Sequence, residues 1–545
     1  MKNAITNIIN FLSSNYAAEK TFNSNVPKVK PNSFRPKTKR IAFLASAVLL
    51  LFLSLFFSGG EAKAASYTVN LNTDANDINE GNGVCDTNAA MPGDQCTLRA
   101  ALAESNSIAG ADSISFALPL PSVISISGSN GALQIYDSVS INGPGARALT
   151  IERDSGKGFG NFRIFQIYGS NIGVSISGVT ITNGNSTNPY SSDFCFGDGG
   201  GICLTSGSLS LTDVTVRNNT GRSGGGIYNG GNLSVTRSTI NNNQASIGGG
   251  GVYTSGGSTA NIINSTISNN TVSNSSDGGG GLFNFGAMLL TNVTVSGNTT
   301  TGPGGGVRNV SGTLSVRNTI IAGNTADTNP DAAGTLNSLG NNLIGISAGN
   351  NGVTSNVNGD KVGIGVPIDA KLGALQSNGG QTDTHALLQG SPAIDAGNNC
   401  VAESAPTGCL NVPLTTDQRG AGFPRRVDGD GNGTATVDIG AFEVQLAPTA
   451  AEVVAGGRIF TAGGRGIRNV RVTVTFSSGE TLTTFSGESG FYEFADLPTS
   501  ETYIFTVSAQ HYTFAQNTQI RSINEDVQDI DFIADMSLKK KKFSH

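Results

Sequence analysis

The sequence of 545 residues is poor in the residues from which most catalytic and metal centres are built. Tryptophan is absent, charged residues make up only 13% of the chain, and three histidines occur, His385, His511 and His545. Zinc sites draw four ligands from neighbouring His and Cys residues, so three scattered histidines argue against zinc. His385 lies near Asp383 but has no second partner for general-base chemistry, and we expect it to be structural.

Basic clusters are also missing from the body of the chain. The formal net charge is −6, and no stripe of lysines or arginines interleaved with aromatic residues is present. We therefore expect no nucleic-acid partner. The one basic run, 539–542, is expected to be a solvated end, with attraction to an acidic surface as the alternative.

Glycine and small polar residues dominate instead. The chain has 74 glycines, and Asn, Ser and Thr crowd between short runs of Val, Ile and Leu. A chain of this length is too long for one compact core, and its composition favours an elongated β-rich repeat.

Five units of similar sequence lie between Val174 and Asn324, and glycine runs follow the first four. The units are 211–219, 235–243, 263–270, 290–298 and 316–324. One apolar column through them, Val216, Ile240, Ile267, Val295 and Ile321, has separations of 24, 27, 28 and 26 residues. Such a period predicts a solenoid of stacked coils.

Apolar and polar residues alternate within each unit, as in Val214 and Val216, which is the period of a β-strand. The sequence therefore predicts an all-β chain built on a right-handed parallel β-helix, and the handedness comes from the general crossover preference. Asparagines recur at the end of each unit and are expected at one corner of the coil, where left-handed conformations and amide ladders are favoured. They are Asn219, Asn243, Asn270, Asn298 and Asn324.

An apolar run from Ile41 to Phe57 follows three basic residues and precedes an Ala-x-Ala pattern at 62–64. It predicts an export signal cleaved near Ala64 or Ala65, with a retained membrane anchor through 41–57 as the alternative. In an exported chain, closely spaced cysteines favour local disulfides. The predicted pairs are Cys85 with Cys96, Cys195 with Cys203, and Cys400 with Cys409.

Three regions of the chain resemble known families. Residues 96–101, Cys-Thr-Leu-Arg-Ala-Ala, resemble the CSLREA domain of exported bacterial β-helix proteins, although Thr97 and Ala100 replace Ser and Glu. Physically, 97–105 is a plausible short helix that would cap the first coil. Five ordered motifs between 372 and 443 resemble the choice-of-anchor ending of the same proteins, which implies a surface location more than an activity.

The region from Gly457 to Phe532 resembles the carboxypeptidase regulatory-like, transthyretin-like β-sandwich, and its alternating apolar residues between turn signals support that fold. Such modules act as spacers or stalk units. The expected organisation is a cytoplasmic-side n-region (1–40), a signal peptide or anchor (41–65), an N-terminal cap (66–120), β-helix repeats (121–345), C-terminal coils and cap (346–446), a linker (447–455), a β-sandwich (456–536) and a basic tail (537–545).

Many parallel β-helices, such as those of the pectate-lyase type, degrade polysaccharides, which requires clustered carboxylates. From Gly199 to Thr325 the only acids are Asp213 and Asp277, more than two coils apart in different columns. We expect no catalytic residue.

The loop Asp428-Gly-Asp-Gly-Asn-Gly-Thr434 resembles the first half of a calcium loop. It predicts either a structural calcium bound by Asp428, Asp430, Asn432, Thr434 and Asp438, or an exposed Asp/Gly turn. No other cofactor is expected.

These features together favour a non-catalytic cell-surface or secreted solenoid for adhesion, or for envelope or matrix binding, with a surface polysaccharide or a protein as ligand. The alternative is a polysaccharide lyase or glycoside hydrolase of the parallel β-helix class.

Overall fold

The computed structural model describes residues 64–127, 129–156, 160–187, 195–273, 277–347, 352–445, 453–476, 479–498, 501–523 and 525–537. The expected n-region, nearly all of the signal or anchor segment and of the basic tail, and most of the linker lie outside these ranges. None of the described helices is long and apolar enough to span a membrane.

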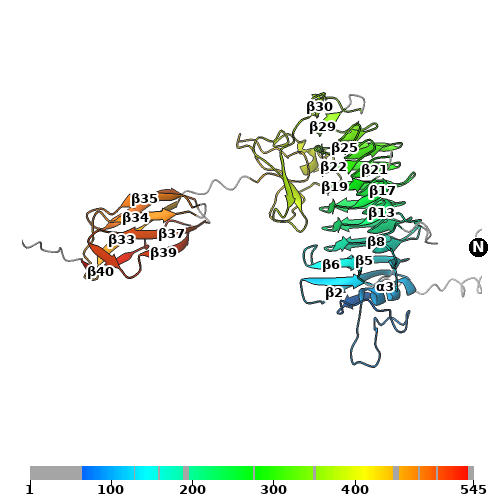
Figure 1. Cartoon of the computed structure of the whole chain (residues 1–545), viewed down its shortest axis with the longest axis horizontal. Helices are drawn as coiled ribbons and strands as arrows, with labels where there is room; N and C mark the ends of the chain where they lie inside the picture. The colour runs from blue at the N-terminus through cyan, green and yellow to red at the C-terminus, as the bar shows by residue number, and fades with distance from the viewer. Residues whose placement is uncertain are drawn as a thin grey trace, which may run out of the picture. The chain divides into compact units, whose positions relative to one another are not determined.

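The described residues between 66 and 364 wind into stacked coils whose strands pair in parallel with the coils before and after (Figure 1). The predicted fold, a parallel β-helix followed by a small β-sandwich, is confirmed. A complete coil contributes strands to three sheets, which we call A, B and C. Sheet A carries two stacks of strands, because each coil bends once within it.

The first stack of sheet A contains β1 (Ser66–Val69), β2 (Ala111–Phe116), β5 (Ser138–Asn142), β8 (Gly173–Ser177), β11 (Ser208–Thr212), β15 (Asn232–Thr236), β19 (Thr259–Ser268), β22 (Ala287–Ser296), β25 (Thr313–Arg317) and β28 (Asn337–Ser338). The second stack contains β3 (Ser122–Ile126), β6 (Leu149–Arg153), β9 (Thr180–Thr182), β12 (Thr215–Arg217), β16 (Thr239–Asn241), the second halves of β19 and β22, β26 (Ile320–Ile321), β29 (Leu343–Ser347) and β30 (Lys361–Ile364).

Sheet B contains β4 (Leu133–Ile135), β7 (Phe165–Ile167), β10 (Ile202–Leu204), β14 (Ile227–Asn229), β18 (Val252–Thr254), β21 (Leu282–Asn284), β24 (Val307–Asn309) and β27 (Ala332–Ala333). Sheet C contains β13 (Thr220–Ser223), β17 (Gln244–Gly248), β20 (Thr271–Val272) and β23 (Thr299–Thr300).

The apolar column predicted from the repeat forms the inside of the second stack. Val216, Ile240, Ile267, Val295 and Ile321 are successive partners in parallel register. All five side chains are fully buried. Burying each of them stabilises the fold by about 1.5–3 kcal/mol, so the column is a main source of cohesion between coils.

Two adjacent positions form the corner after this stack. One position carries the asparagine ladder, and the residue before it takes the left-handed conformation. The side-chain amide of Asn219 donates to Asn243 at 2.9 Å, and the same 2.9 Å bond repeats to Asn270, Asn298 and Asn324. These five side chains are buried and form the predicted ladder. The left-handed conformation belongs to the residue just before each rung of the ladder; these residues are Asn218, Asn242, Asn269, Gly297 and Gly323.

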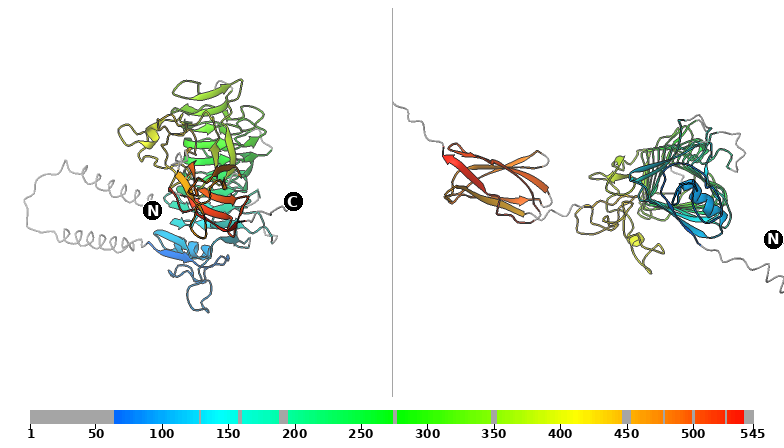
Figure 2. Two further views of the ribbon diagram at one scale, coloured as in Figure 1. Left: turned by 90° about the vertical axis from the view of Figure 1, so that its left-hand side faces the viewer. Right: turned by 90° about the horizontal axis from the view of Figure 1, so that it is seen from below.

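A helix covers the first coil, as the sequence predicts. Helix α3 (Leu98–Ser107) begins at Thr97, whose side chain accepts a hydrogen bond from the backbone of Ala100. Arg99 pairs with Asp74 at 2.6 Å. Seen along the stack, α3 lies across the end of the coils (Figure 2, right). It therefore shields the core that an open first coil would expose.

Beyond β30 the chain returns along the solenoid instead of adding further coils. We call residues 369–445 the strap. It contains the antiparallel hairpin of β31 (Leu372–Gln376) and β32 (Thr384–Leu387) and the short helix η1 (Asn399–Ala402). Its hydrogen bonds and one ion pair reach successive coils of sheet A; the solenoid partners include Arg147, Thr239, Asn264, Thr266, Ser268, Asn292, Thr294, Asn318 and Asn341.

The last described unit is a sandwich of two four-stranded sheets (Figure 1). One sheet contains β36 (Phe491–Leu497), β33 (Val453–Thr461), β40 (Phe532–Ser537) and β38 (Tyr512–Phe514); the other contains β35 (Thr481–Phe485), β34 (Arg471–Thr475), β37 (Glu501–Ser508) and β39 (Thr518–Ile523). Its strands pair antiparallel except for β33 with β40. Tyr503 and Phe505 are among its fully buried residues.

The inward column can be tested within one strand, β19. We expect Ile267→Asp to destabilise the solenoid by several kcal/mol, because it buries an unpaired carboxylate. The matched control is Ile263→Asp, since Ile263 lies on the outer side of the same strand. Thermal unfolding followed by circular dichroism should show a large loss only for Ile267→Asp, and equal losses in both variants would contradict the inward assignment.

Candidate functional site

The outer side of the first stack of sheet A is lined mainly by small polar side chains, and we call it the hydroxyl face. Its residues alternate with buried apolar ones, as in β11, where Leu209 and Leu211 point inward. Register aligns the outward positions from coil to coil; the central column contains Ser113, Ser140, Ser175, Ser210, Ser234, Asn261, Leu289 and Ser315.

Charge is nearly absent from this face. Among the described outward positions from Ser66 in β1 to Thr313 in β25, none is Asp, Glu, Lys or Arg, and Arg317 is the first charged residue. Coils lie about 4.8 Å apart, so hydroxyl groups recur along the central column at that spacing except at Asn261 and Leu289. Some bond to side chains of the neighbouring coil, as the Thr259 hydroxyl donates to the amide oxygen of Asn232 at 2.8 Å. The face is therefore an ordered, uncharged array of donors and acceptors.

Two acids of the coils, Asp213 and Asp198, are held by arginines. Asp213 accepts two hydrogen bonds from Arg237, at 2.9 and 2.7 Å, and these bonds raise the pKa of Arg237. Asp198 makes the same bidentate contact with Arg222, at 3.0 and 3.3 Å. In both pairs the arginine lies 24 residues after the acid, so each ion pair joins neighbouring coils.

The two acids singled out by the sequence lie on different sheets. Asp213 stands at the bend between β11 and β12 in sheet A, whereas Asp277 precedes β21 in sheet B. Their separate places agree with the columns assigned from the repeat. A glycosidase needs two carboxyl groups flanking one bond.

Sheet B carries an aromatic ladder that was not predicted from the sequence. The rings of Tyr228, Tyr253 and Phe283 stack on successive coils, with centroids 5.4 and 5.1 Å apart and interplanar angles of 11° and 9°. Burial raises the pKa of Tyr253 to about 12. The signal was present in the sequence, since an aromatic residue stands at the same place in 227–229, 252–254 and 282–284. Because the ring faces cover one another, the ladder joins neighbouring coils.

The acidic loop of the strap brings together two predicted calcium ligands and one that the sequence missed. Carboxylate oxygens of Asp395, Asp428 and Asp430 lie within 4.8 Å of one another. One oxygen of Asp395 accepts the backbone N–H of Asp430 at 2.6 Å, and its other oxygen is buried without a partner among the described residues. Oxygen ligands of this kind suit Ca²⁺. These three residues could hold one ion.

The other predicted ligands play different parts. Asn432 bonds to Asp430 at 2.9 Å and accepts the backbone N–H of Thr434, so both belong to the exposed turn itself. Asp438 is fully buried, and its two oxygens accept the backbone N–H groups of Asp395 and Val444. The structure therefore assigns Asp438 to the inside of the strap, outside the group of three acids.

Asp438 belongs to a buried charged cluster with Glu443 and Arg425, all of them fully buried. Burial raises the pKa of Glu443 to about 9 and that of Asp438 to about 6, while Arg425 opposes both shifts. Arg425 also donates to the backbone carbonyls of Asp438 and Gly440. The cluster fixes the end of the strap beside Asn292 of the solenoid.

His385 joins the strap to the solenoid. Its Nε2 lies 2.9 Å from the hydroxyl of Ser268 in β19, and its Nδ1 lies 2.7 Å from the carbonyl oxygen of Gly373. Burial lowers the pKa of His385, so the imidazole is held in its neutral form. Its contacts are those of a structural residue.

Three disulfides close short loops: Cys85 to Cys96, Cys195 to Cys203, and Cys400 to Cys409. No cysteine of the described chain is free. Disulfides of this kind are typical of proteins that fold in an oxidising environment outside the cytoplasm.

Comparisons with known proteins identify no family for this chain. No protein-family model matches the chain, and no curated protein is similar to it. Among the solved structures that match, "The Bacillus anthracis TIE protein" is similar over 19% of this chain at 16% identity, with a TM-score of 0.13. The match covers 20% of that protein's chain. The resemblances to the CSLREA, choice-of-anchor and carboxypeptidase regulatory-like families therefore stay expectations.

Calcium can be tested through stability. We expect Ca²⁺ at about 100 times its Kd to add about 2.7 kcal/mol to the free energy of unfolding of the wild-type chain. Asp428→Asn combined with Asp430→Asn should abolish that gain in differential scanning calorimetry. The control is Asp369→Asn, an acid of the strap outside the group. An equal calcium response in the wild type and the double variant would exclude this loop as the site.

The neutral state of His385 makes attachment of the strap sensitive to acid. Its pKa is lower in the folded than in the unfolded chain, so stability falls as the pH drops through the ordinary value of 6.5. We expect His385→Gln to lose this acid-dependent part. Comparing unfolding free energies of the wild type and the variant between pH 7 and pH 5 isolates the histidine, and parallel curves would contradict it.

Proposed function

We propose that this chain is an exported, non-catalytic solenoid that binds an extended, uncharged polysaccharide of a cell surface, envelope or matrix through its hydroxyl face. The observation that carries the proposal is the aligned polar column of β2, β5, β8, β11, β15, β19 and β25, which only Leu289 of β22 interrupts. Hydroxyl groups repeated at about 4.8 Å suit many weak hydrogen bonds to a polymer. Such contacts gain strength by being multivalent.

The strap supports the choice of face. It bonds to the outer side of the second stack through contacts such as those of Thr239, Thr266 and Thr294. The outward residues of the first stack remain partly or fully exposed over most of its length. The first stack is thus the side of sheet A that can meet a ligand.

Paired acids support a binding role over bond cleavage. Both carboxylate oxygens of Asp213 and of Asp198 accept hydrogen bonds from an arginine. Neither acid is therefore a good candidate for one of the two free carboxyl groups that a glycosidase needs. The location outside the cytoplasm is supported by three disulfides and by the predicted export segment at 41–65. The sandwich would then serve as a spacer.

Binding to the face is tested by adding charge to it. Purified chain should be retained on neutral glucan surfaces, and retention should change little with added salt, because the face carries almost no charge. We expect Ser175→Glu combined with Ser234→Glu to reduce retention at least about tenfold, since each introduced carboxylate must be desolvated against the polymer.

The matched control is Ser246→Glu combined with Thr301→Glu, which adds the same charge away from sheet A. Equal loss in both double variants would point to a general charge effect and remove the face from the proposal. Incubation with the bound polymer should release no new reducing or unsaturated sugar ends. Reproducible release would favour the lyase or hydrolase alternative.

A further inference from the structure

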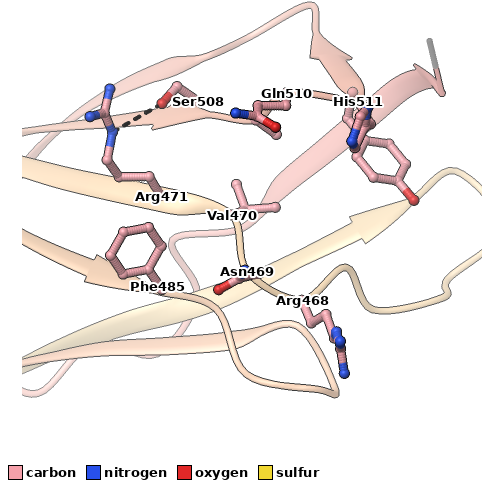
Figure 3. A pocket seen from close by; sticks show the side chains of 10 residues that line it. Arg468, Asn469, Val470, Arg471, Phe485, Ser508, Gln510 and His511 are labelled. Atoms are coloured by element: carbon pink, nitrogen blue, oxygen red, sulfur yellow. Dashed lines mark hydrogen bonds between the residues drawn. The ribbon is translucent and has the colours of Figure 1, made fainter. Parts of the chain in front are cut away.

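The sandwich carries a hollow of about 680 Å³ that the binding face of the solenoid does not involve. It lies where residues 468–470 enter β34 and where β37 connects to β38. Figure 3 shows Arg471 and Phe485 at one end, Arg468 and His511 at the other, and Val470 between them. Val470 is buried and forms the apolar floor.

The charge of the hollow is opposite to that of the module around it. Residues 453–537 include ten acids and only five arginines. Two of those arginines and one histidine line the hollow, and none of the ten described lining residues is an acid. A concave, positively charged site on an acidic module favours an anionic group over any cation.

Both arginines have donors to offer. Arg471 donates from Nε to the hydroxyl of Ser508 at 3.3 Å, which orients the side chain and leaves its terminal amino groups without a hydrogen bond in the described chain. Arg468 meets Glu488 only at 3.7 Å, with side chains 73% and 92% exposed, and such a surface pair is weak. The planar guanidinium group binds carboxylate and phosphate through two parallel hydrogen bonds.

The remaining lining fits a sugar or polyol. The ring of Phe485 is 57% exposed and presents an apolar surface beside Arg471. Asn469, Ser508 and Gln510 add side-chain donors and acceptors for hydroxyl groups. We propose that this hollow binds an anionic unit of a polyhydroxylated polymer, recognised by its carboxylate or phosphate group. The inference is separate from the hydroxyl face, which contains neither arginine.

The test measures retention of the whole exported chain on three immobilised polymers: a polyuronate, a polyol phosphate and a neutral glucan. We expect retention on at least one anionic polymer, and the two anionic arms distinguish carboxylate from phosphate. Arg468→Ala combined with Arg471→Ala should weaken that retention at least about tenfold, since charge-assisted hydrogen bonds are lost.

The matched control is Arg465→Ala combined with Arg521→Ala, which removes the same charge from exposed arginines of the same module outside the hollow. It should weaken retention less than about twofold. Equal loss in both double variants, no loss in either, or no retention on any anionic polymer would overturn the inference. Retention on neutral glucan tests the hydroxyl face alone, so the two proposals fail separately. All four arginines are exposed, and unfolding curves verify that each variant is folded.

Discussion

Parallel register between coils is the constraint on which the rest of this structure depends. Backbone pairing aligns Val216, Ile240 and Ile267 inside the stack, and the buried amides of Asn219 and Asn243 repeat the same alignment at the corner. A slip of one residue would turn every inward side chain outward. Because strands and asparagines are fixed together, the core and the surfaces are set by the same coil-to-coil match.

Because successive coils are in register, residues that recur once per repeat unit form a continuous surface. A single serine on one strand is an ordinary polar residue, whereas Ser175, Ser210 and Ser234 in register make a column of hydroxyl groups. The same logic pairs Asp213 with Arg237 and stacks Tyr228 on Tyr253. Function on a solenoid is therefore decided by what recurs at one position of the coil, more than by any one residue.

The repeat made the fold predictable, because inward residues recur at a period that only stacked coils explain. The helix that begins at Thr97 and the three cysteine pairs were likewise visible in local sequence. Features formed between distant segments were not. Asp395 lies next to Asp428 only because of the fold of the strap. Asp438 is buried in a tertiary cluster that the residues next to it in sequence do not predict. The Tyr228 column lies outside the repeat units from which the coils were aligned, so its recurring aromatic residue was overlooked.

The strap changes how such a stack should come apart. Coils that touch only their neighbours can fray from an end, one after another, as in other linear repeats. Here one segment holds Arg147 near one end of the solenoid and Asn341 near the other, through Asp383 and Ala396. Opening an end coil therefore also loosens a tie to coils far along the stack. The strap therefore couples coils that a linear array would leave independent.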